Sequence, residues 1–168
     1  MSLRTIVIDP HPTLRKLAKK VTQFDDQLHT LIDDMIETMQ EAPGVGLAAP
    51  QVDISQRVIV VQFGDEEDFE APQQLYAVVN PRISSFSEEI VLGVEGCLSI
   101  PGLVGEVQRP FAATIEGVDR DGAPLTIEAE GWLARIFQHE VDHLNGVLFT
   151  DHALRVWHAD DDEVDDDI

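Results

Sequence analysis

The 168-residue chain lacks several features that would assign it to particular classes of protein. It has one cysteine, so it can form no internal disulfide, and a lone thiol is typical of reducing compartments. No apolar run is long enough to cross a bilayer. The first residues, MSLRTIVIDPHPTLRK, contain neither a long apolar segment nor a small-residue cleavage site. We therefore expect a cytoplasmic protein without membrane contact.

Basic residues are also scarce. Eleven Lys and Arg stand against 32 Asp and Glu, and the formal net charge is −21. Direct nucleic-acid binding needs basic patches that neutralise phosphates, so this balance argues against that class. Seven of the nine residues 160–168 are acidic. We expect one domain over residues 1–151, followed by a solvated acidic tail over residues 152–168.

Apolar spacing indicates helices at both ends of the domain. Hydrophobic content of 43% suffices for one packed core. Residues 24–42 have apolar side chains at gaps of three and four, which predicts an amphipathic helix. Residues 11–21 predict a short helix opened by Pro12. A further helix is predicted over residues 131–145, with Gly146 placed to end it.

The segment after residue 50 has the pattern of strands. Five β-branched runs separated by turn residues cover residues 57–63, 74–81, 89–94, 112–118 and 125–131. An Asp-Gly turn within residues 119–124 predicts a hairpin between the last two. Because the strands are grouped and helices do not alternate with them, the order predicts an α+β fold with an antiparallel or mixed sheet.

The stretch QHEVDHLNG, residues 138–146, suggests a metal site. On a helix, His139 and His143 lie one turn apart on the same face, and Glu140 follows the first of them. In the H-E-x-x-H pattern the histidines bind a metal and the glutamate is a general base. A pair of core histidines with an ion-paired glutamate would give the same five residues, so the motif alone does not decide between the two.

A catalytic metal needs a third protein ligand. Phe149 stands where one protease class has a histidine, and Glu163, the alternative used by another class, lies in the acidic run. The better candidate is Cys97 in EGCLS, residues 95–99, because a thiolate binds borderline-soft divalent metals well. A third stretch, GVGLAAPQ (44–51), is a loop of small residues that would let a substrate backbone approach, and it ends in the amide donor Gln51.

Together the three stretches resemble the signature motifs of peptide deformylases, G-x-G-[LI]-A-A-x-Q, E-G-C-L-S and Q-H-E-x-D-H, in the same order. The resemblance runs from about residue 5 to residue 151. It implies a deformylase-like α+β fold, with short, mainly antiparallel sheets around a central metal-binding helix at about 131–145. It also implies a hydrolase of protein biosynthesis that removes the formyl group from N-formylmethionyl nascent peptides and releases formate.

The resemblance further implies the roles of individual residues. Cys97, His139 and His143 would bind one divalent metal, natively Fe²⁺, with Zn²⁺, Ni²⁺ or Co²⁺ as alternatives. A metal-bound hydroxide would attack the formyl carbon, with Glu140 as general acid and base. The transition state would be stabilised by the side-chain amide of Gln51 and the backbone N–H of Leu98.

Substrate and supporting contacts follow from the same resemblance. The methionine pocket maps onto Val45, Trp132, Arg135, Ile136 and His139, with Gly44 and Gly46 at its entrance. Glu95 is expected to pair with Arg109, and Gln138 and Asp142 are candidate partners of the metal-bound imidazoles. Val104 stands where many family members have an arginine. We expect a monomer that contacts the ribosome transiently.

Three other functions use some of the same residues. A metalloprotease would cut internal peptide bonds with the same helix. An enzyme with Cys97 as nucleophile and a histidine base would survive chelation of metals. A non-catalytic, metal-stabilised binding protein would have no use for Glu140 as an unligated base.

Overall fold

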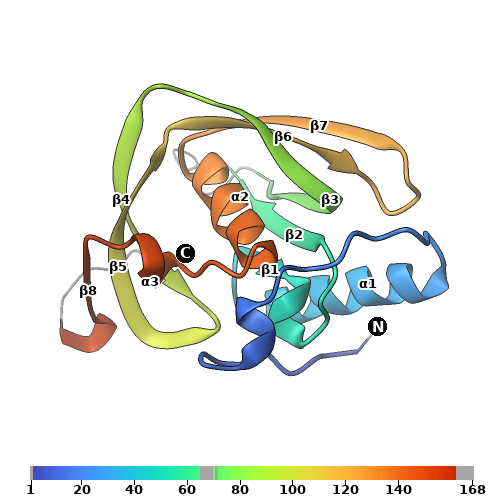
Figure 1. Ribbon diagram of the computed structural model, residues 1–168, viewed down its shortest axis with the longest axis horizontal. Helices are drawn as coiled ribbons and strands as arrows, with labels where there is room; N and C mark the ends of the chain where they lie inside the picture. The colour runs from blue at the N-terminus through green and yellow to red at the C-terminus, as the bar shows by residue number, and fades with distance from the viewer. Residues whose placement is uncertain (1, 65–69, 71, 162–168) are drawn as a thin grey trace.

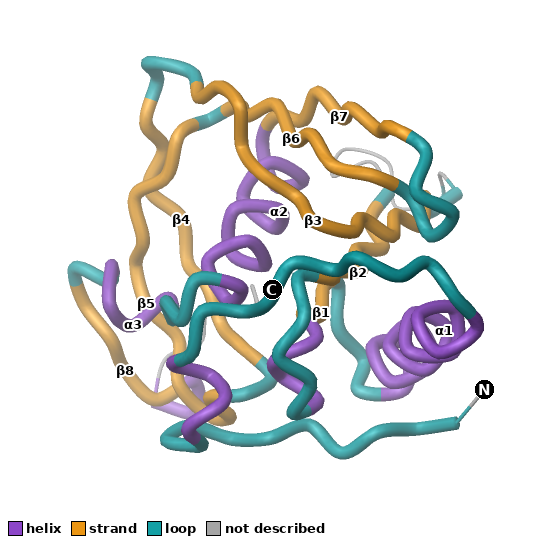
Figure 2. Tube along the Cα trace, turned by 45° about the vertical axis from the view of Figure 1, so that its right-hand side comes forward, coloured by secondary structure: helices purple, strands orange, loops and turns teal. Residues whose placement is uncertain are grey.

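Two antiparallel sheets surround one central helix. The computed structural model describes residues 2–64, 70 and 72–161. Helix α2 (Gly131–Leu144) lies between the sheets, and α1 (Asp26–Glu41) packs at the far side of the larger one (Figures 1 and 2). The architecture confirms the predicted α+β class. Among the described residues, no helix is long and apolar enough to span a membrane.

The larger sheet has the strand order β1-β2-β3-β6-β7, and every neighbouring pair in it is antiparallel. Its strands are β1 (Gly46–Ala48), β2 (Val58–Phe63), β3 (Gln74–Phe86), β6 (Ala112–Val118) and β7 (Pro124–Glu130). The predicted hairpin joins β6 to β7. Its turn is held by Asp119, whose Oδ1 accepts the backbone N–H groups of Asp121 and Ala123 at 2.8 and 3.0 Å.

The smaller sheet has the order β4-β5-β8, with β4 (Ile90–Cys97), β5 (Ile100–Pro110) and β8 (Arg155–His158). β8 lies in the segment expected to be a tail, and Val104 of β5 is only 5% exposed where it pairs with Trp157. The folded part therefore continues past residue 151, through the short 3₁₀ turn η3 (Ala159–Asp161). The remaining acidic residues, 162–168, lie outside the described residues.

Helix α1 forms where the apolar spacing predicts it. Asp25 caps its start by accepting the Leu28 N–H at 3.1 Å. One face is buried against β1 and β2 and consists of Leu28, Leu31, Ile32, Met35 and Met39. The confirmed periodicity means that packing of this face holds the helix in place, as expected for an amphipathic helix.

The helix predicted over residues 11–21 is wrong for most of its length. Only one 3₁₀ turn, η1 (Pro12–Arg15), forms there. The backbone beyond it bonds to neighbouring segments instead: the Ala18 N–H donates to the Leu144 carbonyl at 2.8 Å, and the Lys19 N–H donates to the Ser55 carbonyl at 3.0 Å. These long-range bonds satisfy the backbone groups that a helix would have paired locally.

Helix α2 ends where the sequence indicates. Gly146 follows its C-cap Asn145 with φ of +74°, the left-handed conformation that favours glycine. A Cβ at Gly146 would lie 2.6 Å from the carbonyl oxygen of Arg15. Two more helical turns lie nearby in the fold. The turn η2 (Ala49–Val52) contacts α2, and α3 (Phe149–His152) follows α2 along the chain. The helix is thereby fixed at its end nearest to His143.

Candidate active site

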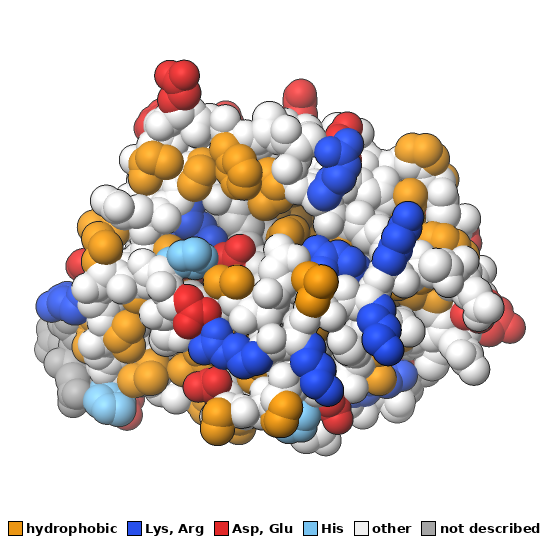
Figure 3. All heavy atoms as spheres, viewed as in Figure 1, with side chains coloured by type: hydrophobic (Ala, Val, Ile, Leu, Met, Phe, Trp, Pro, Cys, Tyr) orange, Lys and Arg blue, Asp and Glu red, His pale blue; other side chains and the backbone are white. Residues whose placement is uncertain are grey.

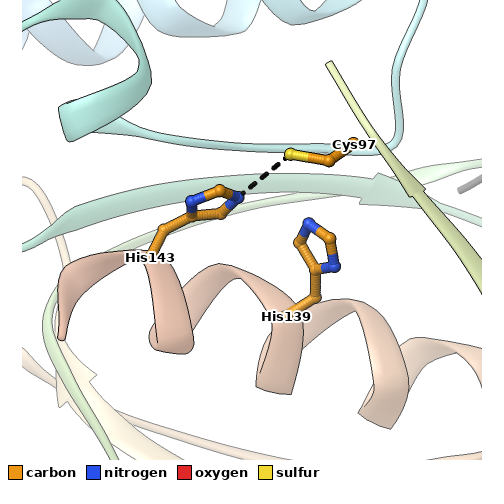
Figure 4. A group of neighbouring side chains, drawn as sticks. All are labelled: Cys97, His139 and His143. Atoms are coloured by element: carbon orange, nitrogen blue, oxygen red, sulfur yellow. Dashed lines mark hydrogen bonds between the residues drawn. The ribbon is translucent and has the colours of Figure 1, made fainter. Parts of the chain in front are cut away.

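Three side chains that the sequence selects as metal ligands meet at one point (Figure 4). Cys97 comes from the end of β4, and His139 and His143 come from successive turns of α2. One potential ligand atom of each lies within 4.8 Å of those of the other two. Sγ of Cys97 is 3.4 Å from Nε2 of His143. One sulfur and two nitrogens suit a borderline-soft divalent ion and leave a fourth position open, so the residues fit such an ion.

The end of β4 delivers Cys97 to this point. The antiparallel register with β5 runs regularly from Ile90 to Gly96 and then shifts between Gly96 and Cys97. A shift of this kind bends a strand and redirects the side chain that follows. Cys97 thus leaves the regular ladder beside the buried face of α2.

Glu95 holds the imidazole of His139. The carboxylate is fully buried, and its Oε1 lies 2.9 Å from His139 Nδ1. Arg109 donates to both oxygens, from Nε at 2.5 Å and Nη2 at 2.9 Å, which confirms the predicted Glu95–Arg109 pair. Burial alone would raise the pKa of Glu95, but the hydrogen bonds with His139 and Arg109 outweigh it and hold the pKa well below its usual value. The ionised carboxylate keeps the proton on Nδ1 and leaves Nε2 for a metal.

Gln138 and Asp142 do not contact the imidazoles, so their predicted role is wrong. Gln138 donates to the Pro110 carbonyl at 3.0 Å, and Asp142 accepts from Arg109 at 2.9 Å. Arg109 offers Asp142 a charge-assisted bond that a neutral imidazole cannot match. Nδ1 of His143 is buried without a hydrogen-bond partner among the described residues.

Charge around the two histidines favours a cation. Burial lowers the pKa of His139, but contacts with Cys97 and Glu95 outweigh it and raise this pKa well above its usual value. Burial, then the charge of His139, lowers the pKa of His143 well below that value. The anionic groups that favour a proton on His139 equally favour a metal ion at the same place.

Glu140 stands beside the ligand group with a free oxygen. The residue is 2% exposed, and Oε1 has no hydrogen-bond partner among the described residues. Burial raises the pKa of Glu140 to about 7. A carboxyl group with a pKa near neutrality can both accept and return a proton. A Cβ at Gly46 would collide with this carboxylate, so a side chain at position 46 would displace it from its present place.

Gln51 and Leu98 lie on either side of Cys97. Gln51 is buried, and its Oε1 accepts the Ala48 N–H at 3.0 Å. Its Nε2 donates to Ser99 Oγ at 3.1 Å and lies 3.7 Å from Cys97 Sγ. Leu98 lines the cleft, opposite Gly44. Ser99 is a site residue that the sequence analysis did not single out, although it belongs to the EGCLS motif.

The ligand group opens into a cleft. A small cavity of about 10 Å³ is lined by Gly46, Gln51, His139 and Glu140, among others. A larger cavity of about 560 Å³ shares with it the residues Gly44, Val45, Gly96, Cys97 and Leu98. These shared residues join the metal ligands to open space large enough for a peptide.

The residues predicted to line the methionine pocket are not gathered in one cavity. Val45 lies in the cleft, while Trp132 and Arg135 line a separate cavity of about 400 Å³ with Val91 and Gly93. Ile136 is 1% exposed and packs in the core. Trp132, Arg135 and Ile136 belong to α2 and Val45 does not, so the pocket stays a prediction.

The alternative third ligands receive no support from the described residues. The position of the histidine used by one protease class is occupied by Phe149, which has no ligand atom and stacks on His139 with ring centroids 6.2 Å apart. Glu163 lies outside the described residues. The thiolate of Cys97 is the side chain that completes the set.

Comparisons with known proteins identify the family of the chain. The sequence model of the polypeptide deformylase family matches residues 3–157. The peptide deformylase of Symbiobacterium thermophilum is 51% identical over 156 residues, which cover 93% of this chain and 69% of the relative. That of Natranaerobius thermophilus is 45% identical over 161 residues, which cover 96% of this chain and 99% of the relative.

Solved structures show the same fold. The Ehrlichia chaffeensis peptide deformylase in complex with actinonin superposes with a TM-score of 0.86 at 39% identity, over 92% of this chain and 91% of that one. The Thermotoga maritima peptide deformylase superposes with a TM-score of 0.84 at 42% identity, over 91% and 99% of the two chains. The chain therefore belongs to the peptide deformylase family, whose members are hydrolases that act on formyl-methionyl peptides.

Proposed function

We propose that the chain removes the formyl group from N-formylmethionyl nascent peptides and releases formate, using one divalent metal held by Cys97, His139 and His143. One observation supports this most strongly. The three ligand atoms converge at the foot of a cleft, beside a buried Glu140 oxygen that no described residue hydrogen-bonds. An unpartnered buried carboxylate oxygen is expensive in free energy, so its presence beside a ligand set indicates a chemical role.

Fe²⁺ is the metal that we propose as native, and Zn²⁺, Ni²⁺ and Co²⁺ suit the same sulfur and nitrogen donors. When bound, such an ion supplies Lewis acidity, which polarises a carbonyl oxygen and lowers the pKa of a coordinated water. Glu95 contributes by fixing His139 through Nδ1. The thiolate of Cys97 lowers the net charge that the ion brings into the buried site.

Glu140 moves the proton in this proposal. Its free oxygen accepts a proton from the attacking water and then delivers it to the leaving amine. The Gln51 amide, 3.7 Å from Cys97 Sγ, and the Leu98 backbone N–H would donate to the oxyanion that develops on the formyl group. One such donor typically contributes about 3 kcal/mol to transition-state stabilisation.

The peptide would lie in the cleft lined by Gly44, Val45 and Gly46. Small residues there let the substrate backbone approach closely. We keep Trp132, Arg135 and Ile136 as proposed contacts of the methionine side chain, although the described residues place the first two in a separate cavity and the third in the core. We further propose that the protein is a monomer, acts in the cytoplasm and meets the ribosome only transiently.

A thiol nucleophile is a second candidate, because Cys97 Sγ lies 3.4 Å from His143 Nε2. In that enzyme a histidine would activate the thiol, and removal of metals would leave activity intact. Glu140 would then have no function. The deformylase mechanism accounts for both the free Glu140 oxygen and the convergence of three ligands.

Replacement of Glu140 by alanine tests the proposal. Glu140→Ala should keep its metal, because it removes no ligand, and should lower kcat on formyl-Met-Ala-Ser by at least about 100-fold, the usual contribution of a general acid and base. Formate release and metal content per chain would be measured together. Gln138→Ala, which removes a neighbouring contact to the Pro110 carbonyl, is the matched control and should stay within a few-fold of wild type. Near-normal turnover or loss of metal in Glu140→Ala would contradict the assigned role.

A further inference from the structure

The guanidinium of Arg135 lies in the interior, where it connects α2 to both β4 and β5. The Arg135 side chain is 6% exposed. Its Nη1 donates to Glu95 Oε2 at 2.6 Å and to the Val107 carbonyl at 2.9 Å, and its Nη2 donates to the Val91 carbonyl at 2.7 Å. One side chain thus contacts two points on β4 and one on β5. A group that only lined a substrate pocket would need none of these bonds.

Gly93 provides the space that this guanidinium fills. A Cβ at position 93 would lie 2.7 Å from Arg135 Cζ and 2.8 Å from Nε, closer than real Cβ contacts. Gly93 does not have a positive φ, so conformational freedom does not explain the glycine. The missing side chain at position 93 and the guanidinium of Arg135 therefore form a complementary pair.

Arg135 completes the hydrogen bonding of Glu95. Oε1 of Glu95 is paired with His139 and Arg109, and Oε2 accepts from Arg109 and Arg135. Each oxygen therefore has two partners, which satisfies a fully buried carboxylate. Without Arg135, Oε2 would keep one donor, and the carboxylate could rotate away from His139 Nδ1.

The same side chain sets the distance between the elements that carry the ligands. Arg135 precedes His139 by one turn of α2, and the Val91 carbonyl lies on the strand that ends at Cys97. The position of the two histidines relative to the thiolate therefore depends on this connection. Ligand atoms must be held within a few tenths of an ångström for tight metal binding.

We propose that Arg135 is a positioning residue of the metal centre, which orients His139 through Glu95 and fixes β4 against α2. This role differs from the pocket-lining role that the sequence suggests for Arg135. It rests on the proposed metal site, but not on the identity of the substrate. Gly93 belongs to the same device, because it leaves room for the guanidinium.

The test measures the affinity of the metal-free chain for Co²⁺, by titration followed through the thiolate-to-cobalt absorption band. Arg135→Met keeps the aliphatic stem and loses every donor, and it should weaken Co²⁺ binding by about 10-fold or more, as for other residues that orient a ligand. Arg135→Lys should recover part of the loss, because an ammonium can reach one acceptor. Gly93→Ala should weaken binding similarly by displacing the guanidinium. The double variant Gly93→Ala/Arg135→Met should bind no more weakly than Arg135→Met.

Two controls separate positioning from general loss of stability. Arg82→Met removes an exposed arginine paired with Glu116, and Leu28→Ala destabilises the core around α1; neither should change Co²⁺ affinity. The inference is overturned if Arg135→Met binds Co²⁺ as tightly as wild type, if Leu28→Ala weakens binding as much, or if the losses of Gly93→Ala and Arg135→Met multiply. A wild-type chain without the absorption band would instead overturn the proposed metal site itself.

Discussion

At the scale of single residues, the buried carboxylates Glu95 and Glu140 have pKa values shifted in opposite directions. Glu95 is surrounded by hydrogen-bond donors, which stabilise its ionised form, whereas one Glu140 oxygen has no hydrogen-bond partner in the described part of the chain and burial raises the Glu140 pKa to about 7. In the proposed mechanism, environment alone separates the orienting anion Glu95 from the proton carrier Glu140. The sequence does not show this difference in environment, because both are glutamates close to a predicted metal ligand, Glu95 near Cys97 and Glu140 beside His139.

The low pKa of Glu95 predicts a pH-dependent contribution to stability. A depressed carboxyl pKa stabilises the folded chain above the unfolded value, here 4.5, and this stabilisation is lost as pH falls below it. The loss approaches about 1.4 kcal/mol per pH unit for one proton. The advantage of wild type over Glu95→Gln in free energy of unfolding should therefore shrink between pH 5.5 and 3.5.

Urea unfolding of both chains without metal would measure this. In that pH range, His139 of the wild-type chain is protonated in the folded and unfolded states, so it adds no slope of its own there. Burial, the largest cause of the Glu140 shift, is common to both chains, so that part cancels in the comparison. A constant difference between the two chains would contradict the ionised, donor-bound state of Glu95.

At the residue scale, the sequence could predict the chemistry better than the contacts. Cys97, His139 and His143 are recognisable because their motifs require particular side chains at particular spacings. The partner of His139 was missed, since Glu95 lies 44 positions away and reaches it through β4 pairing and the packing of α2. The sequence assigns Arg135 to the substrate pocket, but it does not show the bond to Glu95 or that Gly93 leaves room for the guanidinium.

At the scale of elements, α2 depends on how its C-terminal end is built. Gly146 has φ of +74°, and a Cβ there would lie 2.6 Å from the Arg15 carbonyl oxygen. Gly122, in the turn between β6 and β7, also has a positive φ of +87°, but a Cβ there would make only ordinary contacts, 3.6 Å or longer, with Phe24. A side chain at position 122 would therefore cause backbone strain alone, whereas one at position 146 would cause strain and a collision with Arg15.

Alanine at each position tests this. Gly122→Ala should lower the free energy of unfolding by about 1–2 kcal/mol through strain alone. Gly146→Ala should cost at least about 1 kcal/mol more, because the Arg15 backbone has to move. Denaturant midpoints at constant m-value would give both numbers. Equal losses would show that the contact between Gly146 and Arg15 is looser than described.

Helices and hairpins with local signals could be predicted, and elements that depend on distant partners could not. Helix α1 and the β6–β7 hairpin form where spacing and turn residues predict them. β5 was missed because Pro101, Gly102 and Gly105 interrupt its pattern, and its pairing with β4 and β8 compensates. β8 lies next to an acidic run, and this segment forms a strand by pairing with β5.

At the scale of the whole molecule, charge is unevenly distributed. The net charge is −21, yet Lys and Arg side chains are conspicuous on the face shown in Figure 3. The exposed residues Arg15, Lys16, Lys19 and Lys20 all belong to one N-terminal segment. The rest of the molecule carries the excess of negative charge, which acts on approaching ions beyond direct contact.

This charge predicts a preference among substrates. At low salt, formyl-Met-Ala-Ser with a free carboxylate should have a higher KM than its C-terminal amide. Val104, nearly buried where β5 pairs with β8, offers no cation to that carboxylate. Salt should reduce the difference, since the Debye length falls from about 30 Å at 0.01 M to about 8 Å at 0.15 M. A lower KM for the free carboxylate at every salt concentration would mean that a cation binds that end of the peptide.

We propose that deformylation depends on a metal held by Cys97, His139 and His143, and removing and returning this metal tests that dependence. Formate release from formyl-Met-Ala-Ser would be followed through removal of the metal by a chelator and stoichiometric return of Fe²⁺ or Co²⁺ under anaerobic conditions. If one metal per chain is required, activity should fall to background without metal and return in proportion to the added ion. The increase in activity should stop at one equivalent of ion per chain. Activity that persists in the fully metal-free chain would contradict it and favour the Cys97 nucleophile.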